Sequence, residues 1–145
     1  MKSLSKLLLF LFATGLLASC EKQEYFQSES DVKKELNHSW NQVRMSHNPA
    51  LIPNYYVWIF NGDSLTMIIK NSSDDAVIDT LVGSYSVRTT LTRVFVTTSN
   101  FPDNDSWYWL NTEWTDVSLS GKGLVVAAED PRAGGIKELE FTRND

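Results

Sequence analysis

Cysteine and histidine are nearly absent from this chain. Its 145 residues include one cysteine, Cys20, so no disulfide can form within the chain. The two histidines, His38 and His47, have no neighbours at the spacing of a zinc site. We therefore expect neither a metal ion nor a cofactor.

The chain also lacks an excess of positive charge. Its 13 Lys and Arg residues are outnumbered by 18 Asp and Glu residues, which gives a formal charge of −5 at pH 7. Nucleic acids and anionic lipid surfaces bind clustered cationic side chains. The composition therefore argues against both as partners, and the length favours a single domain.

Recognisable catalytic motifs are missing as well. No glycine-flanked nucleophile elbow is present, and Gly121-Lys122-Gly123 is too short to match a phosphate-binding loop. Asp74-Asp75 and Asp103-Asn104-Asp105 do not follow the calcium-loop pattern, and Asp and Asn are ordinary turn residues. We expect that the protein is not an enzyme.

The N-terminal apolar run is too short to span a membrane. It extends without a charge from Leu7 to Ala18, whereas a spanning helix needs about 20 apolar residues. Two cations, Lys2 and Lys6, precede it. This layout is typical of a secretory signal.

Leu17-Ala18-Ser19-Cys20 follows this run and resembles the lipobox of bacterial lipoproteins. The resemblance implies a diacylglyceryl group on the Cys20 sulfur, cleavage before Cys20 and acylation of the new amino terminus. Two or three acyl chains would hold the protein at a membrane durably. The alternative is an ordinary signal peptide followed by an incidental cysteine.

This interpretation divides the chain into three parts. Residues 1–19 are a cleaved signal peptide, residues 20–29 a lipidated tether, and residues 30–145 the folded domain. Cleavage removes two lysines and no acidic residue, so the formal charge becomes −7. Acidic residues in Glu21-Lys22-Gln23-Glu24 resemble the surface-export signal of lipoproteins in the Bacteroidota, although a solvated linker explains them equally well. We expect an outer-membrane location and leave the face open.

A short helix is predicted at the start of the domain, over residues 28–36. Ser28 or Ser30 can serve as N-cap, and Asp31 lies in the first turn. Val32 and Leu36 have the i, i+4 spacing of a buried helix face. The helix is expected to plug or flank the domain that follows.

From Trp40 onward the pattern is that of β-strands. A first hairpin places Tyr56, Trp58 and Phe60 on one face, opposite Leu65, Met67 and Ile69, with a turn at either Gly62-Asp63 or Asn61-Gly62. A second hairpin places Thr115, Val117 and Leu119 opposite Leu124, Val126 and Ala128, with a turn at Gly121-Lys122.

Further strands are predicted over residues 80–88, 94–98, 107–110 and 137–141, with Leu139 and Phe141 pointing inward. The total is eight or nine closely spaced strands. This number suits an all-β antiparallel barrel or sandwich.

A family resemblance rests on a few motifs within residues 30–143. They are Leu36-Asn37-His38-Ser39-Trp40, Trp58-Ile59-Phe60-Asn61-Gly62-Asp63, Gly83-Ser84-Tyr85 and Leu139-Glu140-Phe141. Together they resemble the small lipocalin-like, calycin-type lipoproteins of Bacteroidota. In that family a tryptophan in the first strand, here Trp40, closes the barrel floor, whereas His38 stands where glycine is expected. The resemblance implies an up-and-down meander of about eight strands closing into a barrel that can hold one small apolar ligand.

The size of the inward side chains raises the question of whether such a barrel is filled or hollow. The inward candidates are bulky: Tyr56, Trp58, Phe60, Met67, Tyr85, Phe95 and Phe141. An eight-stranded barrel is just wide enough to be filled by its own side chains or to keep one pocket. Core packing is the simpler explanation; a ligand pocket would be lined by Tyr56, Trp58, Met67 and Tyr85.

A second aromatic cluster comprises Trp107, Tyr108, Trp109 and Trp114. In a strand over residues 107–110, Trp107 and Trp109 share one face and Tyr108 lies on the other. The outer face needs a cover, which a partner, a sugar or the N-terminal helix could provide, or it is partly exposed.

Two functions therefore remain open. In the first, the protein is a membrane-anchored, non-catalytic interaction or accessory subunit at the outer membrane, with the second aromatic cluster as its contact. In the alternative, it is a carrier or sensor of a small hydrophobic ligand inside the barrel.

Overall fold

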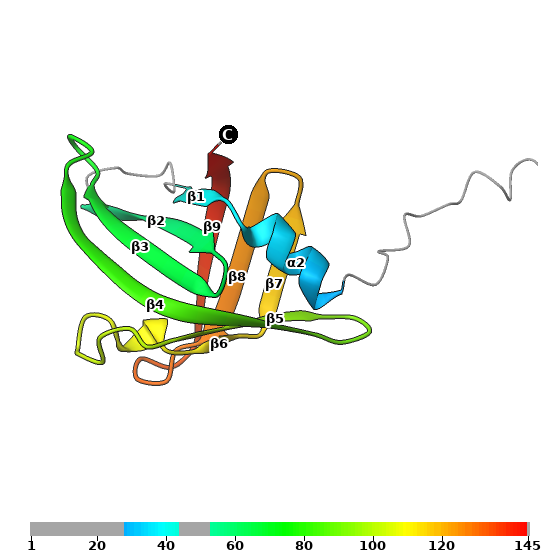
Figure 1. The fold of residues 1–145 in the computed structure, drawn as a ribbon. Helices are drawn as coiled ribbons and strands as arrows, with labels where there is room; N and C mark the ends of the chain where they lie inside the picture. Colours follow the sequence, from blue (N-terminus) through cyan, green and yellow to red (C-terminus); the bar gives the residue numbers. More distant parts are fainter. Residues whose placement is uncertain (1–27, 44–52, 145) are drawn as a thin grey trace, which may run out of the picture.

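The structure is a computed structural model that describes residues 28–43 and 53–144. It contains a short helix followed by nine strands (Figure 1). The elements are α2 (Glu29–Leu36), β1 (Ser39–Gln42), β2 (Asn54–Asn61), β3 (Ser64–Asn71), β4 (Val77–Thr89), β5 (Val94–Ser99), the 3-10 helix η2 (Tyr108–Leu110), β6 (Glu113–Trp114), β7 (Asp116–Ser120), β8 (Gly123–Glu129) and β9 (Ile136–Asn144). The predicted signal peptide, Cys20, the tether up to residue 27 and His47 lie outside the described residues.

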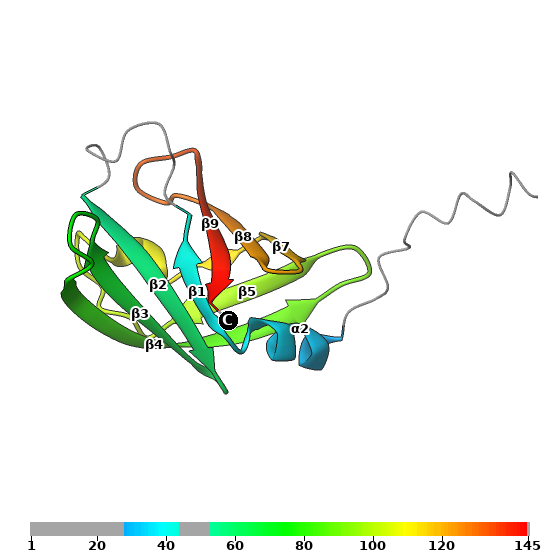
Figure 2. The same ribbon diagram turned by 90° about the horizontal axis from the view of Figure 1, so that it is seen from above.

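The strands form one antiparallel sheet that curls into a nearly closed barrel (Figure 2). The order is β6-β5-β4-β3-β2-β1-β9-β8-β7, so that most neighbours are also consecutive in the chain. The exception is β1, which pairs with both β2 and β9 and joins the two halves of the meander. This confirms the predicted all-β antiparallel barrel with a short helix before it.

Both predicted hairpins form, the first with the Gly62-Asp63 turn. Phe60 lies opposite Leu65, Trp58 opposite Met67 and Tyr56 opposite Ile69. Gly62 has a φ of 62°, a left-handed conformation that glycine adopts without steric cost. The second hairpin turns at Gly121-Lys122, where Gly121 has a φ of 57°.

The helix begins at the first of its two predicted N-caps and packs on the barrel through two residues. The Ser28 side chain is the N-cap and accepts a hydrogen bond from the Asp31 N–H. Val32 and Leu36 are fully buried. The Trp40 side chain is buried beside the helix end, where its Nε1 donates to the Leu36 carbonyl at 2.9 Å.

The predicted strand at residues 107–110 is wrong. The segment is a turn followed by η2, because the Asn104 side chain accepts hydrogen bonds from the N–H groups of Ser106 and Trp107. The backbone carbonyl of Asn104 also accepts a hydrogen bond from the Tyr108 N–H. An asparagine that binds the following backbone in this way competes with strand pairing.

Two inward predictions are also wrong. Phe95 lies on the outer face of β5, where the Arg88 guanidinium sits 4.0 Å from the centre of its ring. Thr115 is exposed, because one extra residue separates the buried Trp114 from the half-buried Val117. Thr115 N–H donates to the Ala127 carbonyl, and Ala127 is also the register partner of Asp116. The chain therefore has a β-bulge here.

Candidate functional site

The barrel interior, the predicted ligand pocket, contains a continuous group of aromatic rings. The Trp58 ring centre lies 4.8 Å from that of Phe141, 5.6 Å from that of Trp114 and 6.0 Å from that of Phe60. Phe60 in turn meets Tyr85 edge to face at 4.8 Å. We call these five residues the aromatic core. Each of the five is at most 3% exposed.

The four predicted ligand contacts belong to this packing. Trp58 and Met67 are fully buried, and Tyr85 is 3% exposed. Tyr56 is half-buried against the core. Burial raises the pKa of both the Tyr56 and the Tyr85 hydroxyl, because a phenolate is poorly solvated there.

One polar atom of the interior lacks a partner. Among the described residues, the buried Nε1 of Trp58 has no hydrogen-bond acceptor. Trp114, its neighbour, donates its own Nε1 to Thr98 Oγ1 at 3.1 Å. A buried donor without an acceptor costs free energy, and the described residues provide no acceptor for Trp58 Nε1.

Residues 103–110, which we call the plug, cover one end of the barrel. Trp109 contacts Tyr56 at 5.6 Å and Trp114 at 6.3 Å between ring centres, and Trp107 contacts Tyr56 at 6.3 Å. The Lys137 Nζ lies 3.8 Å from the centre of the Trp109 ring. Burial lowers the pKa of this lysine.

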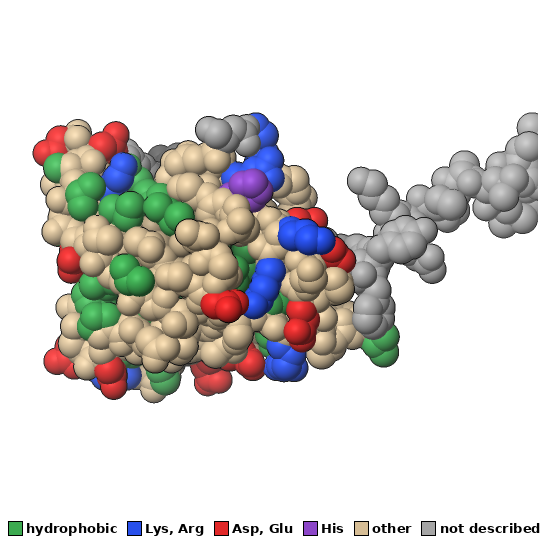
Figure 3. Space-filling model, viewed as in Figure 1, with side chains coloured by type: hydrophobic (Ala, Val, Ile, Leu, Met, Phe, Trp, Pro, Cys, Tyr) green, Lys and Arg blue, Asp and Glu red, His purple; other side chains and the backbone are tan. Residues whose placement is uncertain are grey.

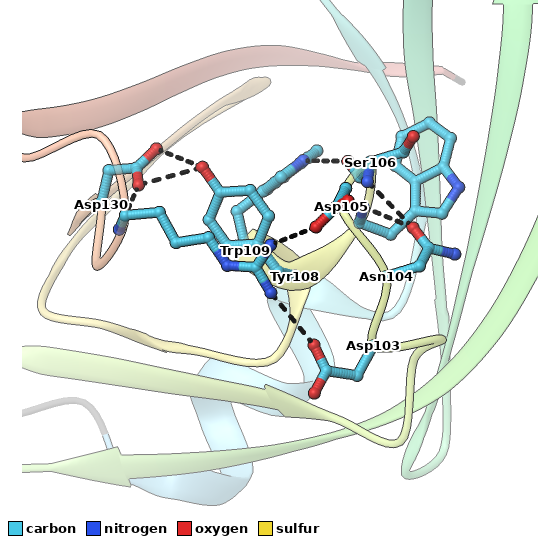
Figure 4. A network of polar contacts seen from close by, with 9 residues as sticks. Asp103, Asn104, Asp105, Ser106, Tyr108, Trp109 and Asp130 are labelled. Atoms are coloured by element: carbon cyan, nitrogen blue, oxygen red, sulfur yellow. Dashed lines mark hydrogen bonds and ion pairs between the residues drawn. The ribbon is translucent and has the colours of Figure 1, made fainter.

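Polar contacts fasten the plug to the loop between β8 and β9 (Figure 4). The Tyr108 hydroxyl reaches both carboxylate oxygens of Asp130, at 3.1 and 3.2 Å. Arg132 pairs with Asp105 at 2.7 Å and lies over the Tyr108 ring. Backbone N–H groups of Ala133 and Arg132 hold the pKa of Asp130 below its ordinary value. The plug is thus tied down by charge as well as by apolar packing.

The predicted contact residues separate into two pairs in this arrangement. Trp109 is 5% exposed and Trp114 is fully buried, whereas Trp107 and Tyr108 are half-buried. Trp107 and Trp109 both pack on Tyr56, while Tyr108 points to Asp130 (Figure 4). Only Trp107 and Tyr108 keep appreciable surface for an external contact.

At the opposite end, α2 is joined to the β2–β3 turn. The Lys33 ammonium pairs with Asp63 at 2.6 Å, and this hydrogen bond raises the pKa of Lys33. A shallow hollow of about 520 Å³ lies between the helix and the turn, beside Tyr85. In the Lys33–Asp63 ion pair the Asp63 side chain is exposed to solvent, so the pair contributes little to the stability of the fold.

A further recess is a groove that the sequence did not predict. It has a volume of about 790 Å³ and lies where the β4–β5 hairpin and β7 diverge. Its lining comprises Asp31, Glu35, Thr89, Thr90, Leu91, Thr92, Arg93, Val94, Thr115, Asp116, Val117, Ser118 and Leu119. We call it the seam groove. The sequence contains no signal for it, because Thr115, Val117 and Leu119 alternate there without a break and the bulge at Thr115 is visible only in the structure.

An exposed apolar patch lies on the outside of the barrel. Val77, Ile78 and Val82 of β4 are each more than half exposed. Hydrophobic side chains gather on this part of the surface, at the left of the space-filling view (Figure 3). β-branched side chains are common on exposed strand faces, so the patch needs no ligand to explain it.

The described residues contain no group of three or more His, Cys, Asp or Glu side chains placed to hold a metal ion. In the same part of the chain, no helix has the length and apolar character required to cross a bilayer.

Comparison of this chain with protein-family models, curated proteins and solved structures finds no match.

Proposed function

We propose that this protein is a non-catalytic interaction subunit, held at the outer membrane by a lipid on Cys20. The filled aromatic core is the observation that supports an interaction role. Trp58, Phe60 and Phe141 occupy the space that a carrier would keep for its ligand, and each is at most 2% exposed. A barrel packed in this way offers its surface, rather than its interior, for binding.

The anchor rests on the sequence alone. Leu17-Ala18-Ser19 before Cys20 has the small residues of a lipobox, and the acidic composition disfavours direct adhesion to anionic lipid. A covalent lipid would then supply the membrane attachment. The likeness to small lipocalin-like lipoproteins of Bacteroidota, proposed on the same footing, fits this arrangement.

A titration with a lipophilic dye tests the interaction proposal. We expect the dye and a fatty acid to leave the tryptophan fluorescence of the natural protein unchanged. Trp58→Ala serves as the positive control, because removal of a buried indole leaves an apolar cavity that can take up small hydrophobic molecules. Saturable binding by the natural protein, as tight as that by the variant, would show that the interior is a ligand site and refute the proposal.

Mass spectrometry of the mature N-terminus tests the anchor. We expect an acylated Cys20 as the first residue, and a Cys20→Ala variant that is neither lipidated nor retained in the membrane fraction. An unmodified Cys20 in the mature protein would contradict the anchor without affecting the interaction proposal.

A carrier or sensor of a small hydrophobic molecule is the second candidate function. The unpartnered Nε1 of Trp58 favours it, because a carbonyl or carboxylate oxygen of a ligand could accept that hydrogen bond. The two functions differ in one measurement: a carrier's dye binding weakens in Trp58→Phe, which removes the N–H and keeps an aromatic ring.

A further inference from the structure

The seam groove separates two strand edges. β6 pairs with β5 only at Val96 and Thr97, and the chain then shifts to β8, where Thr115 N–H donates to the Ala127 carbonyl. Within the described residues, β7 from Asp116 to Ser120 pairs with β8 alone. The first residues of β5 likewise pair with β4 alone. Each strand therefore presents one unpaired edge to the groove.

An unpaired strand edge can form main-chain hydrogen bonds with an added strand. In an antiparallel ladder, alternate residues point their N–H and C=O groups toward and away from the partner strand. Every second residue of β7 thus directs both groups away from β8 and toward the groove. An extended peptide that adds to such an edge gains main-chain hydrogen bonds, and its side chains enter the neighbouring pockets.

The groove also provides an apolar floor. Val94, Val117 and Leu119 are partly buried against the core and line the recess. Val117 and Leu119 alternate with the exposed Asp116 and Ser118, as expected for a strand with one face turned inward. Small apolar side chains at alternate positions of a peptide would cover this floor.

The charged side chains that line the groove indicate which charge a bound peptide should carry. Asp116 and the helix residues Asp31 and Glu35 contribute carboxylates, against a single guanidinium from Arg93. Asp31 already lies 3.5 Å from Lys34 and Glu35 also has an interaction partner, so the charge preference rests mainly on Asp116. The chain as a whole is acidic. Both the local and the overall charge favour a cationic segment.

We propose that the seam groove binds an extended, cationic peptide segment of a partner protein, which adds as a strand to the free edge of β7. This inference rests on the proposed function and names the partner's chemistry. The five residues of β7 span about 17 Å at 3.4 Å per residue, and β5 lies close to β7 over part of this length, so the edge accepts a segment of at most five or six residues.

The test uses the full chain and a capped hexapeptide that alternates lysine and valine. Two peptides serve as controls: the same sequence N-methylated at alternate positions, and one with glutamate in place of lysine. We expect binding of the first peptide and at least a tenfold loss with each control. Amide hydrogen exchange should slow at residues 116–120 on binding. Protection elsewhere, or equal binding of the N-methylated peptide, overturns the proposal.

Two charge variants sharpen the test. Asp116→Lys should weaken binding of the lysine peptide about three- to tenfold and improve binding of the glutamate peptide. Asp79→Lys is the matched control, since Asp79 is exposed on β4 outside the groove lining and changes the net charge equally. If Asp116→Lys does not fold, Asp116→Asn removes the charge at nearly constant size. Equal affinities in the groove variant and in Asp79→Lys refute the proposal.

Other outcomes separate this inference from the proposed function. If the residue 116–120 amides are protected in the protein alone, and increasingly so with concentration, a second copy occupies the edge and the peptide assignment is wrong. If a partner is retained by the anchored protein but is insensitive to Asp116→Lys, only the groove assignment fails. Saturable dye binding inside the barrel refutes the proposed function itself.

Discussion

Leu124 and Leu119 face each other across the β7–β8 ladder, yet Leu124 is fully buried and Leu119 is only half-buried. The next inward pair repeats the difference: Val126 is 1% exposed, and Val117 remains partly open. β8 has a paired strand on both sides, whereas β7 borders the seam groove. The comparison teaches that closure of the barrel, rather than residue type, decides how much of an inward side chain is buried.

The plugged end of the barrel and the seam groove also differ in how well their side chains are covered. At the plugged end, Trp109 covers Tyr56 and Trp114, and polar contacts hold it in place. At the seam, Val94 and Leu119 are only partly buried and line a groove instead. The first region is built for stability, and the second keeps surface available.

Trp114→Ala should give the largest effect, because Trp114 lies where the core meets the seam. It is fully buried and contacts both Trp58 and Trp109. Removing a buried indole costs about 3–5 kcal/mol. Chemical denaturation should show this loss, and a much smaller one in the control Trp107→Ala, since Trp107 is half-buried. Equal losses would mean that burial does not distinguish the two tryptophans.

Alanine variants of Leu124 and Leu119 test the difference in burial between β8 and β7 directly. Leu124→Ala should lower the free energy of unfolding by about 2–5 kcal/mol, as expected for a fully buried leucine. Leu119→Ala should cost about 1 kcal/mol, because much of its side chain already contacts water. Denaturation curves of the two variants provide the comparison. A loss at Leu119 as large as that at Leu124 would indicate that the seam is closed in solution.

Gly83→Ala should destabilise the closed side of the barrel. A Cβ at this position would lie 2.5 Å from the Phe101 ring and 2.6 Å from the Ser99 carbonyl oxygen. The expected cost of such overpacking is about 1–3 kcal/mol. Ser86→Ala, at an exposed position of the same strand, is the control and should change the unfolding midpoint little. A neutral Gly83→Ala would contradict the close approach of Phe101 to β4.

Alkaline pH should weaken the packing around two tyrosines, Tyr56 at the plugged end and Tyr85 near α2. Burial raises the pKa of Tyr56 and Tyr85 above the ordinary value of 10.0. Because the folded-state pKa exceeds the unfolded one, this contribution is complete below pH 10 and is lost as the pH rises through the folded-state pKa. The thermal midpoint should therefore fall as the pH rises above 10.0, and fall less in Tyr56→Phe/Tyr85→Phe. Identical pH profiles would exclude the two hydroxyls as the cause.

The smallest effect is expected from Tyr108→Phe, which removes the hydrogen bond to Asp130 and keeps the ring. Amide hydrogen exchange should become faster within residues 103–110 and stay unchanged at residues 116–120 of β7. This outcome would show that the plug opens independently of the seam. Faster exchange in both segments would instead indicate that the two regions open together.

The sequence by itself determined the local rules of this fold. Alternating apolar residues assigned the inward faces of the first hairpin, and two candidate N-caps limited the start of α2 to Ser28 or Ser30; the structure then selected the Gly62-Asp63 turn and Ser28. These features depend on contacts between residues close in the chain, where pattern and turn chemistry act directly. The acylation of Cys20 and the choice of partner stay predictions.

Only the tertiary structure decided how the strands close. Phe95 faces outward under Arg88, Thr115 forms a bulge, and residues 107–110 fold into a plug fixed by Asn104. β1 joins β2 to β9, while β7 is left beside a groove. The physical reason is that a barrel must satisfy volume and pairing around its whole circumference. Distant side chains therefore compete for the same interior, and no single segment contains that information.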